Sequence, residues 1–258
     1  WANDPDTKET IMSGLGDQHI DVVIRRAEAK FQVNLLIREP KVSYKETITR
    51  EGQAMYRHKK QSGGSGQFGE VHLRIKPNHE SEFELTNDIF GGAISASYIP
   101  AIEKGIRNVM KEGVLAGFPI HSISVSVYDG KEHPVDSKPI AFETAGREAF
   151  KLAFAEAGPV LEEPICMAKI VVPEDNMGDI IGDLNTRRAR IMGMDTDHGE
   201  STVTAMVPLA EMIRYTTQLR SMTGGRGTFD LEIQNYEVVP PHITQEVIAA
   251  RAKDKKEE

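Results

Sequence analysis

The chain has 258 residues, of which 39% are hydrophobic and 27% are charged, a composition typical of a soluble globular protein. Its formal net charge of −8 argues against a general polyanion binder, and its single cysteine, Cys166, excludes an intrachain disulfide framework. No apolar run reaches the roughly 20 residues that a membrane helix needs. We therefore expect roughly one to three domains in a reducing cytoplasm.

The first forty residues predict a strand, a helix and a second strand. Residues 10–13 predict the first strand, and Asp17 is a plausible N-cap for the helix that follows. Apolar side chains of that helix recur at the spacing of one buried face: Ile20, Val23, Ile24, Ala27 and Phe31. Residues 33–37 predict the second strand, which ends before Pro40. This order is half of an α+β unit.

Residues 42–163 predict a mixed unit. Strands are expected over 43–48, 52–58, 68–75, 82–85 and 121–128, where "HSISVSVY" alternates with period two. Helices are expected over 98–114 and 140–157, and Pro139 suits the first turn of the second helix.

The last third has the most regular pattern. It predicts a strand over 165–172, a helix over 176–188, a hairpin of 190–196 and 201–208, a helix over 209–222 and a strand over 228–238. This βαββαβ order is the ferredoxin-like arrangement. Residues 245–258 predict a short helix that frays into a charged tail.

The stretch "GSGQFGEV", residues 64–71, fits the glycine-rich loop of a protein kinase and also the shorter dinucleotide fingerprint. A dinucleotide site needs a helix after the glycines, whereas "EVHLRIKP" alternates like a strand. A kinase needs His-Arg-Asp and Asp-Phe-Gly, but the sequence has no His-Arg-Asp and only the near miss "DIFG". A Walker A loop is absent as well. The glycines therefore indicate either a loop that approaches a polyanion closely or a flexible hairpin tip without a partner.

Basic residues gather in three places despite the acidic net charge. Lys59 and Lys60 precede the glycines, within a lysine- and arginine-rich run from residue 41 to residue 76. The other clusters are Arg187, Arg188 and Arg190, and Arg214, Arg220 and Arg226. Solvated surface accounts for many such clusters, but their position beside glycines favours nucleic acid as a partner.

Six motifs in the same order resemble translation elongation factor G. They are "YKETI" (44–48), "HKKQSGGSGQFGEV" (58–71), "GGAISASYIPAIEKGI" (91–106), "VYDGKEHPVDSKPIAF" (127–142), "GDIIGDLNTRRARI" (178–191) and "LRSMTGGRGTF" (219–229). The basic "HKK" and the early "DQH" at residues 17–19 are similar to the elongation factor G-like paralogues.

The resemblance implies an α+β architecture in a definite layout. Residues 1–40 are similar to the C-terminal half of ferredoxin-like domain III, 41–163 to the ribosomal-protein-like βαβ domain IV, 164–240 to the ferredoxin-like βαββαβ domain V, and 241–258 to a C-terminal helix and tail. We expect this chain to be the C-terminal part of a longer protein that carries a GTPase domain, which accounts for the absent Walker A loop.

In this family, domain IV enters the decoding site of the ribosome and promotes translocation of tRNA and mRNA. The resemblance implies a first contact loop of Gln61, Ser62, Gly63 and Gly64, with Lys59 and Lys60 beside it, and a second loop of His133, Asp136 and Ser137. Glycines allow the backbone to approach an RNA minor groove closely. In domain V the resemblance implies contacts with ribosomal RNA phosphates by Arg187, Arg188, Arg190 and Arg226. A helix end attracts arginines by itself, so Arg187 and Arg188 have a structural alternative.

Neither a catalytic triad nor a set of zinc ligands is indicated by the sequence, so we expect no catalysis, metal or cofactor within this chain. GTP and magnesium are expected only for the full-length protein. The expected partners of this monomer are the ribosome, with its RNA and proteins, tRNA and mRNA. Two alternatives stay open: a ribosomal protection or recycling paralogue of the same architecture, and a stand-alone RNA-binding module. The loop sequence "QSGGSGQFG" favours a translocase, and the half-domain at the start counts against a stand-alone module.

Overall fold

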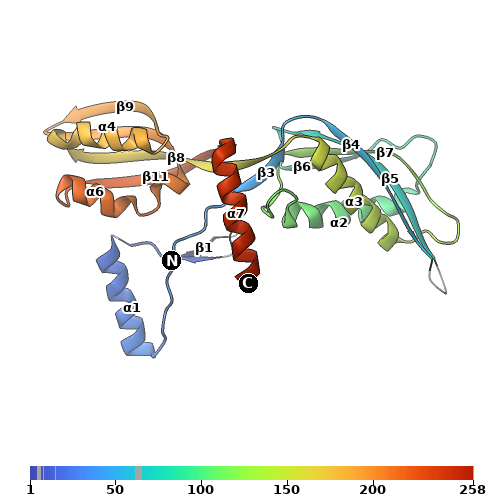
Figure 1. The fold of residues 1–258 in the computed structure, drawn as a ribbon, viewed down its shortest axis with the longest axis horizontal. Helices are drawn as coiled ribbons and strands as arrows, with labels where there is room; N and C mark the ends of the chain where they lie inside the picture. Colours follow the sequence, from blue (N-terminus) through green and yellow to red (C-terminus); the bar gives the residue numbers. More distant parts are fainter. Residues whose placement is uncertain (5–6, 8, 15, 62–65, 258) are drawn as a thin grey trace. The chain divides into compact units, whose positions relative to one another are not determined.

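The computed structural model describes residues 1–4, 7, 9–14, 16–61 and 66–257. The chain divides into two compact units, each made of two segments (Figure 1). Unit 1 comprises Trp1–Ser43 and Glu163–Glu237, and unit 2 comprises Tyr44–Glu162 and Val238–Glu258.

Unit 2 is built on a four-stranded sheet with the order β4-β5-β7-β6. Its strands are β4 (Gly52–Lys60), β5 (Gln67–Pro77), β6 (Phe83–Asn87) and β7 (Ile123–Lys131). β4 and β7 run antiparallel to β5, whereas β6 runs parallel to β7. Consequently β4, β6 and β7 all end on the side of the sheet where β5 begins. We call this side the loop end of unit 2.

Two helices pack on this sheet and form one core with it (Figure 1). The chain enters α2 (Ile99–Glu112) through the short helix η1 (Ala96–Tyr98), and α3 (Pro139–Glu156) begins at the predicted proline. The apolar stripes of both helices meet the inward side chains of β5 and β7, and the largest buried members are Leu73, Ile75, Ile102, Ile106, Ile123, Phe142, Phe150 and Phe154. The β6–α2–β7 order is the predicted βαβ unit.

A buried carboxylate fixes the connection between α2 and β7. Glu46 lies in β3 (Lys45–Ile48) and is completely buried. Its two carboxylate oxygens accept hydrogen bonds from the five successive backbone N–H groups of residues 114–118, at 2.7–3.0 Å. Hydrogen bonds to an ionised acceptor are about twice as strong as neutral ones. This acidic residue of the predicted basic run is therefore an internal anchor.

The strand β8 (Pro159–Pro173) begins earlier than the predicted residue 165. Gly158 turns the chain with φ of 67°, and Pro159 then opens the strand, a position where its missing N–H is tolerated. In unit 2 this first part of β8 pairs antiparallel with β3, from Ile48 opposite Pro159 to Lys45 opposite Glu162.

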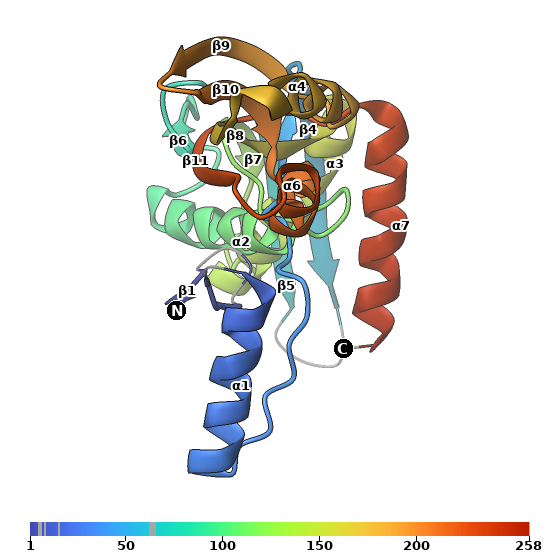
Figure 2. The ribbon, with the colours of Figure 1, turned by 90° about the vertical axis from the view of Figure 1, so that its left-hand side faces the viewer.

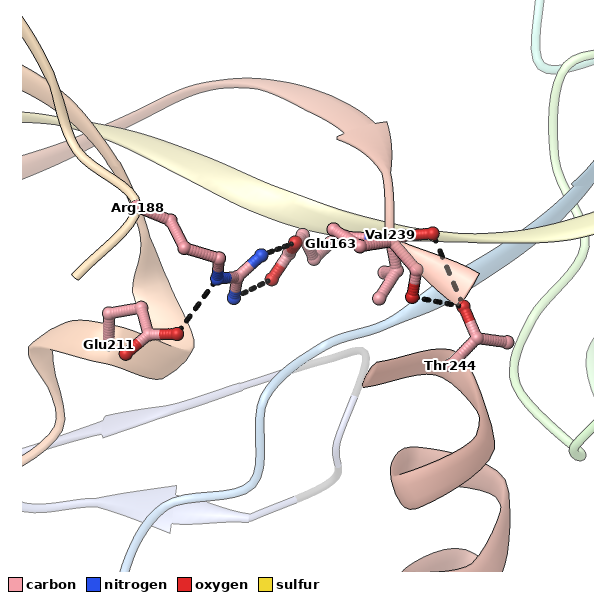
Figure 3. A network of polar contacts seen from close by, with 6 residues as sticks. Glu163, Arg188, Glu211, Val239 and Thr244 are labelled. Carbon is pink, nitrogen blue, oxygen red and sulfur yellow. Dashed lines mark hydrogen bonds and ion pairs between the residues drawn. The ribbon is translucent and has the colours of Figure 1, made fainter. Parts of the chain in front are cut away.

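The C-terminal helix α7 (Pro241–Glu257) starts at Pro241 rather than at the predicted Gln245 (red in Figure 2). The N–H of Val239 donates to the carbonyl of Leu161 at 2.9 Å, which ties the entry of the helix to β8. Thr244 then donates its hydroxyl to the carbonyls of Val239 and Pro240 at 3.2 Å (Figure 3).

Residues 163–237 of unit 1 have the predicted ferredoxin-like βαββαβ order. The sheet order is β11-β8-β10-β9, and both neighbours of β10 run antiparallel to it. Its further elements are η2 (Glu174–Asn176), α4 (Met177–Thr186), β9 (Arg190–Asp197), β10 (Glu200–Pro208), α5 (Leu209–Met212), α6 (Tyr215–Thr223) and β11 (Thr228–Val238). The predicted single helix over 209–222 is wrong. Arg214 adopts a left-handed φ of 60°, which interrupts the helical hydrogen bonds between α5 and α6.

The first forty residues depart most from prediction. They contain β1 (Ala2–Asn3) paired with β2 (Thr10–Ile11), and α1 (Asp17–Phe31) with Gly16 rather than Asp17 at its N-cap. The predicted strand over 33–37 is wrong, because the described residues 32–44 form neither a strand nor a helix. The predicted buried face of α1 is also incorrect, since Val23 is 38% and Phe31 66% exposed.

Candidate nucleic-acid interface

Three connections leave the loop end of unit 2, because three strands end and one begins there (Figure 1). They are residues 61–66 between β4 and β5, residues 88–95 after β6, and residues 132–138 between β7 and α3. The described ends of the first loop that the sequence singled out, Gln61 and Gly66, and the whole second loop, residues 132–138, therefore share one end of the sheet. In the first of them, the predicted Ser62, Gly63 and Gly64 lie outside the described residues.

The ring of His133 is held by the backbone of its own loop. Its Nδ1 accepts hydrogen bonds from the N–H of Val135 at 3.3 Å and of Asp136 at 3.2 Å. A neutral imidazole that accepts at Nδ1 carries its proton on Nε2. The side chain is half exposed, so the loop presents an oriented Nε2–H donor.

Ser137 joins this loop to the start of β5. Its hydroxyl accepts the backbone N–H of His133 at 2.8 Å and donates to the carbonyl of Phe68 at 3.0 Å. The N–H of Phe68 donates in return to the carbonyl of Asp136 at 2.9 Å. A Cβ on Gly66 would lie 2.8 Å from the Asp136 carboxylate, so only glycine fits there without a shift. Phe68 and Gly66 thus position the second loop. Neither residue was predicted, because local patterns do not show contacts across 69 residues.

Lys59, Lys60 and Gln61 are exposed at the end of β4. Lys60 lies opposite Gln67 in the ladder, and His58 bonds the Gln67 side chain at 3.0 Å across the hairpin. The paired strands therefore carry these three residues to the same end as the His133 loop. Their contact with RNA stays a prediction.

The described glycines of the "GSGQFGEV" stretch serve packing rather than nucleotide binding. Gly69 lies within β5, where an added Cβ would approach the backbone of Ala141 and Phe142 at 3.1–3.2 Å. Gly66 makes room for Asp136, as described above. Neither glycine precedes a helix, and a dinucleotide phosphate is bound at a helix N-terminus. The described residues therefore do not fit a dinucleotide fingerprint at this position.

A charged cluster lies on β4 and β5, the strands that lead to the loop end. Glu70 forms an ion pair with Arg57 and a hydrogen bond with Nε2 of His72, the latter at 3.0 Å. Burial by itself would raise the pKa of Glu70, but hydrogen bonds from His72 and Arg57 outweigh it and lower the pKa of this carboxyl. Glu70 therefore stays ionised and neutralises part of the predicted basic run.

Arg187 is engaged within unit 1. Its guanidinium bonds the carboxylate of Asp183 at 2.8 Å, the side chain of Gln218 at 2.6 Å and the carbonyl of Glu211, and it lies 4.9 Å above the ring of Tyr215. Only 15% of the side chain is exposed. These contacts satisfy the guanidinium without a phosphate.

Arg188 is also bound internally (Figure 3). It forms a bidentate pair with the carboxylate of Glu163, which is almost completely buried, and a further ion pair with Glu211 at 2.8 Å. Hydrogen bonding to Glu163 raises the pKa of Arg188 above its already high value. A buried carboxylate needs such a partner, which gives Arg188 a structural role.

The other two predicted phosphate ligands are more accessible. Arg190 pairs with Glu237 but remains 58% exposed. Arg226 is exposed on the turn after α6, and its guanidinium donates to the carbonyl of Thr223 at 3.2 Å. The phosphate contacts of all four arginines stay predictions, and the geometry favours Arg190 and Arg226.

Two further properties concern the described part of the chain. None of its helices combines the length and apolar character that crossing a membrane requires. Within the same residues, histidine, cysteine and carboxylate side chains form no cluster of three that could hold a metal ion.

Comparisons with known proteins agree with the motifs. Family models match residues 40–158 as elongation factor G, domain IV, residues 160–247 as elongation factor G C-terminus, and residues 1–39 as Elongation Factor G, domain III. An elongation factor G-like protein from Thermotoga maritima is 43% identical over 260 residues, across 100% of this chain and 38% of the relative. A crystal structure of a protein from Thermus thermophilus superposes with a TM-score of 0.86 at 41% identity, covering 98% of this chain and 38% of that protein.

The chain thus spans well under half the length of these two relatives. The three matched segments follow one another along nearly the whole chain. This chain belongs to the elongation factor G family.

Proposed function

We propose that this chain is the ribosome-binding C-terminal portion of a translational GTPase that promotes translocation of tRNA and mRNA. In this proposal, GTP is hydrolysed by a part of the protein outside the chain. The loop end of unit 2 enters the decoding site, and Arg190 and Arg226 of unit 1 approach ribosomal RNA phosphates. The partners, the magnesium and nucleotide requirement, the cytoplasmic location and the monomeric state belong to the same proposal.

The observation that carries the proposal is the preorganised His133 loop. Two backbone N–H groups hold Nδ1, Ser137 closes the loop, and β5 braces it from the side. A donor that is already oriented loses little conformational freedom on binding. RNA offers acceptors for it in 2′-hydroxyls, phosphates and base edges.

The test replaces His133 in the full-length protein by two residues, each of which keeps the function of only one of the two ring nitrogens. In His133→Asn the amide oxygen replaces the Nδ1 acceptor, but the Nε2–H donor is lost. In His133→Gln the side-chain NH2 can reach the position of Nε2 and donate a hydrogen bond from there. We expect Asn to slow single-turnover translocation about 10- to 100-fold, because a hydrogen bond to RNA is lost, and Gln to recover part of the rate.

Ribosome-stimulated GTP hydrolysis is the internal control, and it should stay within about twofold of wild type in both variants. Equal loss of translocation and hydrolysis would contradict a specific role of this loop. A protein that hydrolyses GTP on ribosomes without moving tRNA, and splits subunits or displaces a bound drug instead, would support the protection or recycling paralogue. RNA binding without any GTPase activity in the full-length protein would support the stand-alone module.

A further inference from the structure

The third connection at the loop end, residues 88–95, carries an aromatic side chain that the site described above does not use. Phe90 is 96% exposed, more than any other aromatic residue in the described part of the chain. The adjoining Asp88, Gly91 and Gly92 are also exposed. Phe90 therefore presents an almost fully accessible ring at the end of the sheet where the His133 loop lies.

This loop is anchored on both sides of Phe90. Before it, the N–H of Asp88 donates to the carbonyl of Val127 at 2.8 Å, and the hydroxyl of Ser126 donates to the Asp88 carboxylate. Ile89 packs against the core of unit 2. Phe90 is thus the residue that turns outward while its neighbour turns inward.

On the other side, the loop is tied to the segment of His133. The N–H of Ser95 donates to the carboxylate of Glu132 at 2.9 Å, and Glu132 directly precedes His133. Two glycines complete the turn, since Gly91 and Gly92 have φ of 73° and 72°. Apart from the glycine and its two chain neighbours, no heavy atom of the described residues lies within 4 Å of the place where a Cβ would stand at either glycine, so a partner backbone has access there.

We propose that Phe90 stacks on an unpaired nucleobase and so makes residues 88–95 a third RNA contact of the loop end. This inference rests on the proposed function, because it takes the loop end to be the face that meets RNA. The chemistry of this end of the sheet favours a nucleic acid, because the exposed Lys59 and Lys60 there can bind the phosphates of a strand whose base stacks on the ring. Stacking requires only the flat face of a ring, and every base supplies such a face.

The test measures binding of the fluorescently labelled full-length protein to purified ribosomes programmed with mRNA, at one fixed salt concentration. Phe90→Ala and Phe90→Leu should each raise the Kd about 5- to 100-fold, because neither offers a ring to stack on. Phe90→Trp should bind within about twofold of wild type, since Trp stacks as well as Phe. Leu152→Ala is the matched control, a half-exposed apolar residue on α3 of the same unit, and should leave the Kd unchanged.

The Phe90→Leu variant distinguishes stacking on a base from burial in an apolar protein pocket. A protein pocket would accept the leucine side chain, whereas a base has no ring to stack on. A Phe90→Leu variant with wild-type affinity, or an unchanged Phe90→Ala variant, overturns the inference and leaves the proposed function intact. Wild-type full-length protein that fails to bind ribosomes overturns both. In a second measurement, p-benzoylphenylalanine at position 90 should cross-link to RNA, and cross-links confined to ribosomal protein overturn the inference.

Discussion

Single buried side chains hold whole segments of this chain in place. Glu46 collects five backbone N–H groups, and Arg188 satisfies the buried Glu163. Both residues look like surface charges in the sequence, because lysines, arginines and glutamates are usually exposed. Their partners are far away along the chain, so neither the charge pattern nor the family resemblance showed that Arg188 pairs with Glu163.

We expect Glu46→Gln to destabilise unit 2 by about 2–4 kcal/mol. The amide keeps one acceptor oxygen, but its NH2 group faces backbone N–H groups and leaves them unsatisfied in a buried site. Urea denaturation followed by the fluorescence of a probe in unit 2 measures the change in the free energy of unfolding.

Glu51→Gln provides the control for this change. Glu51 is 57% exposed and pairs with Arg74 at 3.0 Å on the surface, where such pairs contribute about 0–1 kcal/mol. Equal effects of the two substitutions would contradict the anchoring role of Glu46.

At the scale of elements, α2 and α3 approach each other closely where glycines replace side chains. A Cβ on Gly105 of α2 would lie 2.1 Å from the carbonyl oxygen of Glu143, and one on Gly146 of α3 would lie 2.9 Å from the side chain of Ile102. A backbone atom cannot move aside as a side chain can. The seam between the two helices therefore requires a glycine at position 105.

Gly105→Ala should destabilise unit 2 by about 1–3 kcal/mol, because the helices must separate to admit the methyl group. Gly178→Ala is the counterpart in α4, where nothing lies within 4 Å of the added Cβ. That change should stabilise the helix by about 0.5–1 kcal/mol through backbone entropy. Thermal unfolding of both variants checks the signs, and a stabilising Gly105→Ala would show that the seam tolerates a wider spacing.

The sequence predicted the type of most elements, because their apolar residues recur with a clear period of two or of 3.6. The βαββαβ order of residues 163–237 and the β6–α2–β7 unit are confirmed in this way. The failures occur where a pattern depended on a tertiary partner. Residues 33–37 have strand composition but form no strand, and Arg214 breaks a helix through a left-handed φ that its sequence does not show.

The loops of the candidate site could be predicted from the sequence, but the contacts that hold them could not. Family motifs pointed to the His133 loop and to the glycine loop, and strand directions explain why both lie at one end. The bracing of the second loop by Phe68 and Gly66 joins distant residues and could not be seen locally. The sequence did not single out Phe90, which it noted only as part of the near miss "DIFG". A sequence does not show whether a lone aromatic residue is exposed or buried.

At the scale of the molecule, a net charge of −8 has to be reconciled with the proposed RNA partner. The charge pairs on and beside β4 and β5 show that acidic side chains neutralise most of the nearby basic ones. Glu70 holds Arg57 and His72, and Glu51 holds Arg74, so these basic residues contribute little free charge. Lys59 and Lys60 stand at the loop end of β4 as exposed residues. Attraction to RNA should therefore be local, while the acidic remainder of the surface opposes binding elsewhere.

The salt dependence of ribosome binding should reflect this local attraction. Each lysine that contacts a phosphate contributes about one to the slope of log Kd against log salt concentration. We expect Lys59→Gln and Lys60→Gln each to lower that slope by about one, measured by titrating the labelled full-length protein with purified ribosomes over a series of salt concentrations. Lys111→Gln removes the same charge from the last turn of α2, which runs away from the loop end, and should leave the slope unchanged. If all three variants lowered the slope equally, binding would follow the overall charge of the molecule, and the loop end would lose its assigned place in the interface.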